Sequence, residues 1–513
     1  MINNLEETPW DILIIGGGAT GMGAAIDAAS RGYKTLLVEK EDYGKGTSSK
    51  STKLIHGGVR YLQQGNVSLV LEALKERALL KNNAPHIVHD LKFVVPTYDW
   101  WESPFYGIGL KMYDWLAGKE GFGDSELLSK EETIRFLPTV EQKGLRGGVI
   151  YHDGQFDDTR LLINMMQTAK EQGATILNYY EFLNFTKTKE GIIDGGIIKD
   201  AINNKQYSIK AKAVVNATGV FSDSIRQMDN NTASKIMTSS QGVHIVLDKS
   251  FLPGDTAIMI PETDDGRVLF AVPWHDKIIV GTTDTPVKEY PYEPVAQKEE
   301  INFLLTHTAK YLTKNPNRGD VKSVFVGLRP LVKNGNAEDT KSISREHVIE
   351  VSSNGLITIA GGKWTTYRKM AEDTIDKAAM ITNLPDIKSD TEYLNIHGHK
   401  TNIDSNDFLG VYGTDADLIM DLVKKRPELK EKIHPEHSII KAQIVWAIKN
   451  EDAKTVEDFL ARRTRLLFLD ARASLECTNI VAEIFKQELN LDEEWKQEQV
   501  IRYTKHAQLY LLK

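Results

Sequence analysis

The stretch from residue 11 to residue 39, DILIIGGGATGMGAAIDAASRGYKTLLVE, constrains the fold of this chain more than any other. Its pattern predicts a strand over residues 12–15, a glycine turn, a helix over residues 20–30 and a second strand over residues 35–38. Gly16, Gly18 and Gly21 keep the G-x-G-x-x-G spacing, which allows a tight turn and a close approach of the backbone to a pyrophosphate. The N-terminus of the helix adds unpaired N–H groups and the positive end of its dipole. This stretch therefore predicts a βαβ unit that binds a dinucleotide.

Glu39 ends the second predicted strand, where a carboxylate can accept hydrogen bonds from a ribose diol. A negative charge at this position disfavours a 2′-phosphate, so NADP is the dinucleotide that the sequence favours least. The glycine spacing also occurs in βα units that bind no nucleotide, and it does not separate NAD from FAD. The choice between these two cofactors depends on other parts of the chain.

Length and composition indicate a multidomain globular protein. The 513 residues are too many for one ordinary domain, and 41% are hydrophobic and 26% charged. The net charge of −8 argues against a nucleic-acid-binding function. Cys477 is the only cysteine, which excludes an intramolecular disulfide and a cysteine metal cluster and favours a reducing, cytoplasmic location. We expect neither a signal peptide nor a membrane span.

Two later glycine turns predict that the chain returns to the first sheet. Residues 211–219, AKAVVNATG, read as a strand that ends in a small-residue turn at Gly219. From residue 355 a strand reaches Ala360 and is followed by a turn at Gly361 and Gly362, with Lys363 next to it. A helix begins near Thr365, and its positive end suits the negative charge of a reduced flavin, which a nicotinamide does not carry. The returns therefore predict FAD and a nucleotide domain that is discontinuous in sequence.

Between residues 238 and 332 the alternation of apolar and polar residues predicts an antiparallel sheet. We therefore expect an α/β protein with a discontinuous, Rossmann-like FAD-binding domain (1–90, 145–235 and 335–384), an inserted antiparallel-sheet substrate domain (91–144 and 236–334) and a helical C-terminal domain (385–513). His244 and Arg329 stand within apolar strands of the second region. A buried structural role is the commoner outcome for such residues, but two of them on one sheet invite a ligand.

Three other stretches leave alternatives open. LIHGGVRYL, residues 54–62, sets Arg60 and Tyr61 in an apolar run, which implies either a structural ion pair or a substrate site. The aromatic stretch YDWWESPFYGIGLKMYDW, residues 98–115, suits the headgroup zone of a bilayer, a quinone groove or an interdomain core. The cluster of Arg462, Arg463 and Arg465 favours a solvated face or interdomain ion pairs.

These blocks together resemble the FAD-dependent glycerol-3-phosphate dehydrogenases of aerobic metabolism. The resemblance runs in order over essentially the whole chain and is carried by GGGATG (16–21), TSSKSTKLIHGGVRYL (47–62), NATGVFSD (216–223), GVHIVL (242–247), GTTDT (281–285), GLRPL (327–331), SREHVI (344–349) and GGKWTTYRKMAE (361–372). The chain lacks the long insert of the oxygen-using oxidases of this group and the calcium-binding C-terminal extension of its mitochondrial members.

The resemblance implies that sn-glycerol 3-phosphate is oxidised to dihydroxyacetone phosphate by hydride transfer to N5 of FAD. Electrons then pass to ubiquinone or menaquinone, which implies an enzyme that is cytoplasmic and peripherally bound to the inner face of the cell membrane. A homodimer is compatible with this family, and the aromatic stretch becomes the leading candidate for membrane contact. No nucleic acid and no metal ion are expected.

The resemblance also implies the site residues. Cations and a phenol around the substrate phosphate are Arg60, Tyr61, Arg329, Arg345 and Lys363. His244 is the preferred catalytic base, with Arg329 beside it, and His56 is the alternative base but is better explained as a flavin contact. The residues implied to bind FAD are Gly16, Gly18, Ala19, Thr20, Gly21, Glu39, Thr47, Ser48, Ser49, His56, Gly57, Gly219, Asp284, Gly362, Lys363 and Thr365.

Three other functions share parts of this pattern. A flavin oxidase of amines or amino acids would need a carboxylate clamp and an apolar side-chain pocket in place of so many cations. A tRNA-modifying flavoprotein would need a basic surface, which the net charge of −8 discourages. A flavin-binding sensor without catalysis would have no use for the cluster of arginine and lysine residues.

Overall fold

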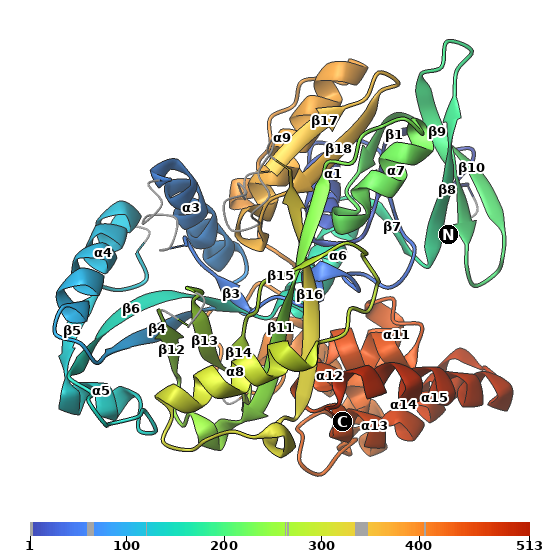
Figure 1. Ribbon diagram of the computed structural model, residues 1–513. Helices are drawn as coiled ribbons and strands as arrows, with labels where there is room; N and C mark the ends of the chain where they lie inside the picture. Colours follow the sequence, from blue (N-terminus) through green and yellow to red (C-terminus); the bar gives the residue numbers. More distant parts are fainter. Residues whose placement is uncertain are drawn as a thin grey trace.

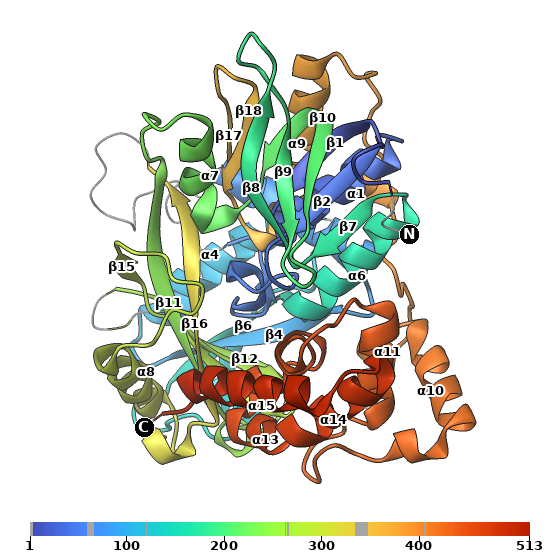
Figure 2. The same cartoon turned by 90° about the vertical axis from the view of Figure 1, so that its right-hand side faces the viewer.

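The computed structural model describes residues 4–58, 66–118, 121–261, 263, 266–333, 347–404 and 407–512. It consists of a nucleotide sheet, a second and larger sheet, and a group of C-terminal helices (Figure 1). The C-terminal helices lie against both sheets, as a second view shows (Figure 2). This mixed α/β architecture confirms the fold class that we expected from the sequence.

The nucleotide sheet is built from the three separated parts of the sequence that carry glycine turns. Its parallel strands, in spatial order, are β7 (Thr175–Asn178), β2 (Thr35–Glu39), β1 (Trp10–Ile15), β10 (Gln206–Asn216) and β18 (Leu356–Gly361), and β17 (His347–Val351) runs antiparallel to β18 at the edge. Ile14 pairs with Leu37 on one side and with Val215 on the other. The first strand therefore lies at the centre, where the direction of strand succession reverses.

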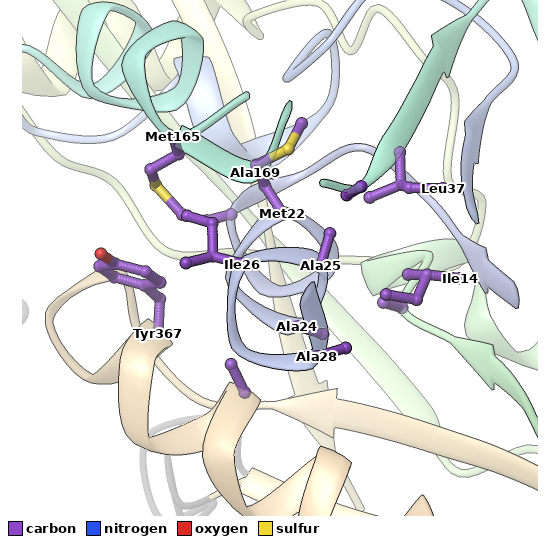
Figure 3. Packing of buried hydrophobic residues seen from close by; sticks show 14 of the residues in the cluster. Ile14, Met22, Ala24, Ala25, Ile26, Ala28, Leu37, Met165, Ala169 and Tyr367 are labelled. Atoms are coloured by element: carbon purple, nitrogen blue, oxygen red, sulfur yellow. The ribbon is translucent and has the colours of Figure 1, made fainter. Parts of the chain in front are cut away.

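Small and apolar side chains bring helix α1 (Ala19–Ser30) close to this sheet and to α9 (Tyr367–Thr382). A Cβ atom on Gly23 would lie 2.8 Å from the Tyr367 ring, so only a glycine allows this approach of the two helices. Ile26 is buried between Met165, on α6 (Asp158–Glu171), and Tyr367 (Figure 3). Burial of each such large side chain stabilises the fold by about 1.5–3 kcal/mol.

An antiparallel pair, β8 (Tyr180–Lys187) and β9 (Ile193–Asp200), extends the first half of β10 beyond the nucleotide sheet. A short turn, η3 (Gly219–Phe221), and helix α7 (Ser222–Asp229) follow β10. These elements frame one end of the nucleotide sheet (Figure 2).

The second sheet is antiparallel except where β12 pairs with β4. In spatial order its strands are β15 (Thr285–Val287), β11 (Met237–Asp248), β14 (Lys277–Gly281), β13 (Leu269–Trp274), β12 (Thr256–Ile260), β4 (Val88–Thr97), β6 (Gly147–Phe156) and β3 (Leu54–Ile55), with β16 (Ser323–Val332) beside β11 and β5 (Glu126–Ser129) beside β6. The antiparallel arrangement that we expected between residues 238 and 332 is thus present.

Two strands pair differently from the expected division of the chain, because β3, within 1–90, is paired with β6 and both belong to the second sheet. We placed residues 145–235 with the nucleotide domain, but β6 is hydrogen-bonded to β4 along its whole length, from Gly147 opposite Thr97 to Phe156 opposite Val88. This long ladder makes β6 part of the second sheet. The other domain limits stay a prediction.

Helices cover the outer faces and edges of the second sheet. They are α3 (Val67–Asn83), α4 (Glu102–Ala117), α5 (Lys130–Phe136) and α8 (Lys298–Tyr311). In Figure 1, α3 and α4 lie at the edge that faces away from the C-terminal helices. No described helix is long and apolar enough to cross a membrane.

The C-terminal region is mostly helical, as the sequence predicts. Its helices are α10 (Asp415–Lys425), α11 (Lys441–Asn450), α12 (Leu466–Leu469), α13 (Ala471–Glu476), α14 (Thr478–Leu489) and α15 (Glu493–Ala507), with a π-helical turn at Asp458–Arg463 and a last turn, η11, at Gln508–Tyr510. These helices bury a core that they share with Val246, Trp274, Ile279 and Phe325 of the second sheet.

Buried ion pairs attach the C-terminal helices to the nucleotide sheet. The Asp42 carboxylate, just beyond β2, accepts hydrogen bonds from Arg462 Nε at 2.5 Å and from Arg463 Nη1 at 2.6 Å. Arg465 lies 2.7 Å from Asp157, and all of these side chains are buried. Of the two alternatives for the arginine cluster, the structure shows the interdomain ion pairs.

Candidate active site

The three glycine turns meet at one cavity of about 410 Å³. The first crossing contributes Gly16 and Ala19, the second contributes Gly219, and the third contributes Gly362 and Lys363. The cavity opens at the carboxyl ends of parallel strands where the strand order reverses, which is the usual ligand position in such sheets. Segments that are far apart in the sequence therefore enclose a single site.

The first turn requires glycine at two positions. Gly16 has a φ of +109°, and a Cβ atom there would lie 2.7 Å from the carbonyl oxygen of Ala217. A Cβ atom on Gly21 would lie 2.0 Å from the carbonyl oxygen of Gly16. The two glycines thus keep the first and second crossings in contact, and helix α1 begins directly at the cavity wall with Ala19. Such a cradle fits the pyrophosphate of a dinucleotide.

Glu39 is fixed at the end of β2 by the backbone around it. One carboxylate oxygen accepts from the Gly17 N–H at 2.6 Å, and the other accepts from the Glu41 N–H at 2.9 Å. Burial nevertheless raises the pKa of Glu39 above its ordinary value. Each oxygen keeps a second lone pair, so the carboxylate can still accept hydrogen bonds from a ribose diol in the cavity that it lines.

The short helical turn η1 (Thr47–Ser49) is held between the second sheet and the third crossing. The Thr47 hydroxyl donates to the Leu328 carbonyl at 2.7 Å, and Trp364 Nε1 donates to the Ser48 carbonyl at 2.9 Å. The Ser48 hydroxyl accepts from the Ala19 N–H at 3.0 Å and so caps the beginning of α1. Thr47 and Ser48 line the cavity.

A fully buried ion pair fixes the loop that follows. Lys53 Nζ lies 2.7 Å from both carboxylate oxygens of Asp158 and donates to the Ser49 carbonyl at 2.7 Å. Lys53 has a φ of +62°, so the chain bends sharply between η1 and β3. The ion pair therefore fixes the positions of Ser49 and Thr52. Ser49 lies outside the cavity lining, and the Thr52 hydroxyl contacts the imidazole of His244.

His244 lies behind this loop and does not line the cavity. Its Nε2 lies 2.9 Å from the Thr52 hydroxyl, and its ring stacks on Phe325 with the centroids 4.7 Å apart. Burial, together with Arg329 and Lys53, lowers the pKa of His244 well below 6.5. The imidazole is thus neutral at physiological pH, which is the state that a general base requires.

Arg329 lies on β16, next to Pro330, which lines the cavity. Its guanidinium donates to the Thr283 carbonyl at 2.8 Å and to Asp284 Oδ1 at 3.1 Å. Asp284, which we expected at the cofactor, therefore pairs with Arg329 and does not line the cavity.

The structure brings many of the predicted residues to the cavity. Those that line it are Gly16, Gly18, Ala19, Thr20, Glu39, Thr47, Ser48, Gly219, Gly362 and Lys363. His56 and Thr365 lie behind the lining, where the Thr365 hydroxyl donates to the His56 carbonyl at 3.5 Å. Gly57 donates its N–H to the Tyr113 hydroxyl at 2.9 Å. Arg60, Tyr61 and Arg345 lie outside the described residues.

Other lining residues were not predicted from the sequence. They include Tyr180 and Phe182 of β8, Phe221 and Met228 around α7, and Tyr292 from the segment before α8. Phe221 ends the turn that begins at Gly219, and the other four belong to no glycine turn, so only the tertiary arrangement identifies them. Aromatic side chains that were not predicted from the sequence therefore form part of the cavity wall.

Comparisons with known proteins agree with this site. A family model described as FAD dependent oxidoreductase matches residues 11–368, and one described as the C-terminal domain of alpha-glycerophosphate oxidase matches residues 356–496. The chain is 41% identical over 528 residues to the mitochondrial glycerol-3-phosphate dehydrogenase of Homo sapiens, an alignment that covers 96% of this chain and 72% of that protein.

Solved structures show the same fold. The glycerol-3-phosphate dehydrogenase from Bacillus halodurans, complexed with FAD, superimposes with a TM-score of 0.82 and 29% identity over 99% of this chain and 96% of that one. The L-alpha-glycerophosphate oxidase from Mycoplasma pneumoniae, with FAD bound, has a TM-score of 0.58 and 18% identity over 74% of this chain and 96% of that one. The latter likeness is one of fold alone.

Proposed function

We propose a reaction for this chain, which belongs to the family of FAD-dependent glycerol-3-phosphate dehydrogenases. The protein oxidises sn-glycerol 3-phosphate to dihydroxyacetone phosphate and passes the electrons to a membrane quinone. The observation that carries the proposal is the single cavity at which three glycine turns meet, with Lys363 in its wall and Arg329 next to the lining residue Pro330.

FAD is the cofactor of this protein, and bound FAD supplies the hydride acceptor. We propose that the first turn and the beginning of α1 hold its pyrophosphate and that Glu39 holds its ribose. Lys363 precedes the helical turn η6 (Trp364–Thr366), which continues into α9. The positive charge of Lys363 and the helix dipole therefore act together at the third crossing, where the flavin ring would need compensation for negative charge.

The substrate phosphate, in this proposal, binds on the side of β16. Arg329 now shares its guanidinium between a backbone carbonyl and Asp284. A phosphate dianion offers stronger charge-assisted hydrogen bonds than the carbonyl does, so Arg329 can exchange partners when substrate binds. Arg60, Tyr61 and Arg345 would complete the phosphate site, as the resemblance implies.

We propose His244 as the base that takes the proton of the C2 hydroxyl. His244 and Thr52 both lie outside the cavity lining, and the Thr52 hydroxyl lies 2.9 Å from Nε2, so we propose that the proton crosses the lining and reaches Nε2 through Thr52. A hydroxyl can donate and accept at once, so Thr52 needs no change of charge for this transfer. His56, held by Thr365 behind the lining, is the alternative base.

The aromatic stretch supports the membrane part of the proposal. Trp101, Phe105, Ile108, Met112 and Trp115 follow one face of α4 and are 43%, 53%, 73%, 47% and 78% exposed. A row of large apolar side chains in contact with water indicates a binding surface. We propose that this face enters the headgroup zone of a bilayer, which places a quinone within reach of the protein.

The opposite side of α4 leads back toward the flavin site. The Tyr113 hydroxyl accepts from the Gly57 N–H at 2.9 Å and donates to Asp153 at 2.9 Å. Helix α4 therefore joins the exposed apolar face to the loop that carries His56 and Gly57. This connection supports quinone as the electron acceptor.

Anaerobic mixing with substrates tests the proposal. Glycerol 3-phosphate should bleach the flavin absorbance of the holoenzyme, whereas glycerol and amino acids should not. Bleaching by an amino acid alone would overturn the assignment of substrate. In a second step, a soluble quinone should restore the absorbance of the reduced enzyme faster than oxygen does, and the reverse order would overturn the assignment of acceptor.

A further inference from the structure

Two aromatic rings stack on each other in the wall of the cavity. The rings of Phe221 and Tyr292 stack with their centroids 4.5 Å apart and their planes at 25°, and both residues line the cavity. Phe221 ends η3 at the second crossing, whereas Tyr292 belongs to the segment between β15 and α8. The pair thus connects the nucleotide sheet with a segment that follows the second sheet.

The pair lines the same cavity as the residues at the end of β2. Glu39 and Glu181 line the same cavity. Burial raises the pKa of Tyr292 above its ordinary value, and the negative charges of Glu39, Glu41 and Glu181 add to this effect. Glu39 is the proposed ribose ligand, so the base attached to that ribose lies in the same part of the cavity.

Charged groups hold the segment of Tyr292 in place. Lys50 Nζ donates to the Tyr292 carbonyl at 3.2 Å and to Glu293 Oε2 at 2.8 Å. The Tyr510 hydroxyl donates to the same carboxylate oxygen at 3.0 Å. Although burial raises it, Lys50 and His506 hold the pKa of Glu293 below its ordinary value, so the carboxylate is ionised. Lys50 and Tyr510 are buried.

We propose that the Phe221–Tyr292 pair is an aromatic lid on the adenosine half of FAD, and that Tyr510, in the last turn of the C-terminal region, positions this lid through Glu293. Tyr292 acts on the cofactor directly, whereas Lys50, Glu293 and Tyr510 are positioning residues that act through it. The C-terminal region thereby controls how long the flavin stays bound. The inference depends on the chain binding FAD and not on the substrate or acceptor proposed above.

Release of FAD from the holoenzyme tests the lid without substrate. The holoenzyme is diluted into buffer, and the rise of flavin fluorescence gives the rate of release. Tyr292→Ala should release FAD roughly tenfold to a hundredfold faster, as expected for the loss of one aromatic stacking contact with a base. Tyr292→Phe keeps the ring and should release FAD at the wild-type rate. A wild-type rate for Tyr292→Ala would overturn the proposal.

Tyr510→Phe tests the positioning role of Tyr510, because this substitution removes only the hydroxyl that contacts Glu293. Tyr503→Phe is the matched control, since Tyr503 is an equally buried tyrosine of α15 whose hydroxyl contacts Ser474. Tyr510→Phe should speed release severalfold without a change in the urea midpoint of unfolding, and Tyr503→Phe should not speed it. Equal acceleration of FAD release by both variants would show that any loss of a buried hydroxyl in the C-terminal helices speeds release, and would overturn the positioning role of Tyr510.

A double variant shows whether Tyr510 acts through the lid. If it does, adding Tyr510→Phe to Tyr292→Ala should not change the release rate further, because the group that it positions is already absent. Multiplication of the two separate effects would mean that Tyr510 acts on the flavin by another route, and would overturn this part of the proposal.

Discussion

Asp42→Asn is the change that tests most sharply how the C-terminal helices hold the loop between β2 and η1. Asp42 is fully buried and accepts hydrogen bonds from Arg462 Nε and from both terminal nitrogens of Arg463, at 2.5, 2.6 and 2.9 Å. Asparagine keeps the shape of the side chain but removes the charge that compensates two buried guanidinium groups. Gly44 and Ser48, which follow in the chain, line the cavity.

The size of the effect follows from the ion pairs. Although burial raises it, Arg463 and Arg462 hold the pKa of Asp42 at about 2, against an ordinary value of 3.8. This difference corresponds to ~2 kcal/mol of stability at neutral pH, and removing one partner of a buried ion pair costs about 3–5 kcal/mol. We therefore expect the free energy of unfolding to fall by about 2–5 kcal/mol in Asp42→Asn.

Urea unfolding, followed by circular dichroism and by flavin fluorescence, measures this change. Because the pKa of Asp42 is lowered in the folded protein, the stabilisation by its carboxylate is complete above pH 3.8 and is lost as the pH falls through about 2. The difference between wild type and variant should therefore be constant at neutral pH and should shrink below about pH 4.

Asp421→Asn is the control for this experiment. The Asp421 side chain is 49% exposed and lies 2.7 Å from Lys424, whose side chain is 76% exposed. The same substitution in a solvated ion pair should change the urea midpoint very little. If Asp42→Asn shifted the midpoint no more than Asp421→Asn does, the argument that Asp42 holds the C-terminal helices in place would be refuted.

Three further changes have definite expected results. Gly21→Ala would set a Cβ atom 2.0 Å from the Gly16 carbonyl oxygen, so the purified variant should retain almost no FAD, measured as flavin absorbance per chain. Because the pKa of His244 is lowered well below 6.5, kcat/KM should show no decline centred near pH 6.5, and a decline that His244→Asn abolishes would contradict this. Trp115→Ser removes a side chain that is 78% exposed, and loss of roughly 150 Å² of membrane contact at ~25 cal/mol per Å² should weaken vesicle binding roughly five-hundredfold. Ile501→Ser, at a residue of α15 that is 69% exposed, should leave vesicle binding unchanged.

Short-range patterns in the sequence were sufficient to predict the parts of the fold that contain glycine turns. Gly16 has a positive φ and Gly21 meets the Gly16 carbonyl oxygen, so both constraints lie within the first βα unit and their spacing reveals the turn. Gly219 and Gly362 each follow a short apolar strand, and that order of residues predicts a return to the sheet. The nucleotide sheet could therefore be predicted from residues close together in sequence.

Pairings between distant segments could not be predicted in this way. The apolar pattern of β6 fits either sheet, and only its ladder with β4 decides between them. Tyr292 reaches the cavity because Lys50 and Glu293 hold its segment there, and its own neighbours in sequence give no sign of a ligand. Asp284 stands in a block that suggested a flavin contact, but its pairing with Arg329 depends on the register of two strands.

The exposed face of α4 illustrates the same limit in another way. The sequence shows many aromatic residues but does not show which of them face solvent, so an interdomain core was an equal alternative. In the structure Tyr113 is buried whereas Trp115 is exposed, which separates an inner face from an outer one. Only the outer face supports the proposed membrane contact.

A crystal structure of the holoenzyme with glycerol 3-phosphate, grown without oxygen, tests the central claim most directly. We expect the pyrophosphate of FAD against the first glycine turn, the isoalloxazine at the third crossing beside Lys363, and the substrate phosphate within ion-pair distance of Arg329. The same structure would locate Arg60, Tyr61 and Arg345. A substrate phosphate bound away from Arg329, or a flavin ring that does not reach the third crossing, would contradict the account.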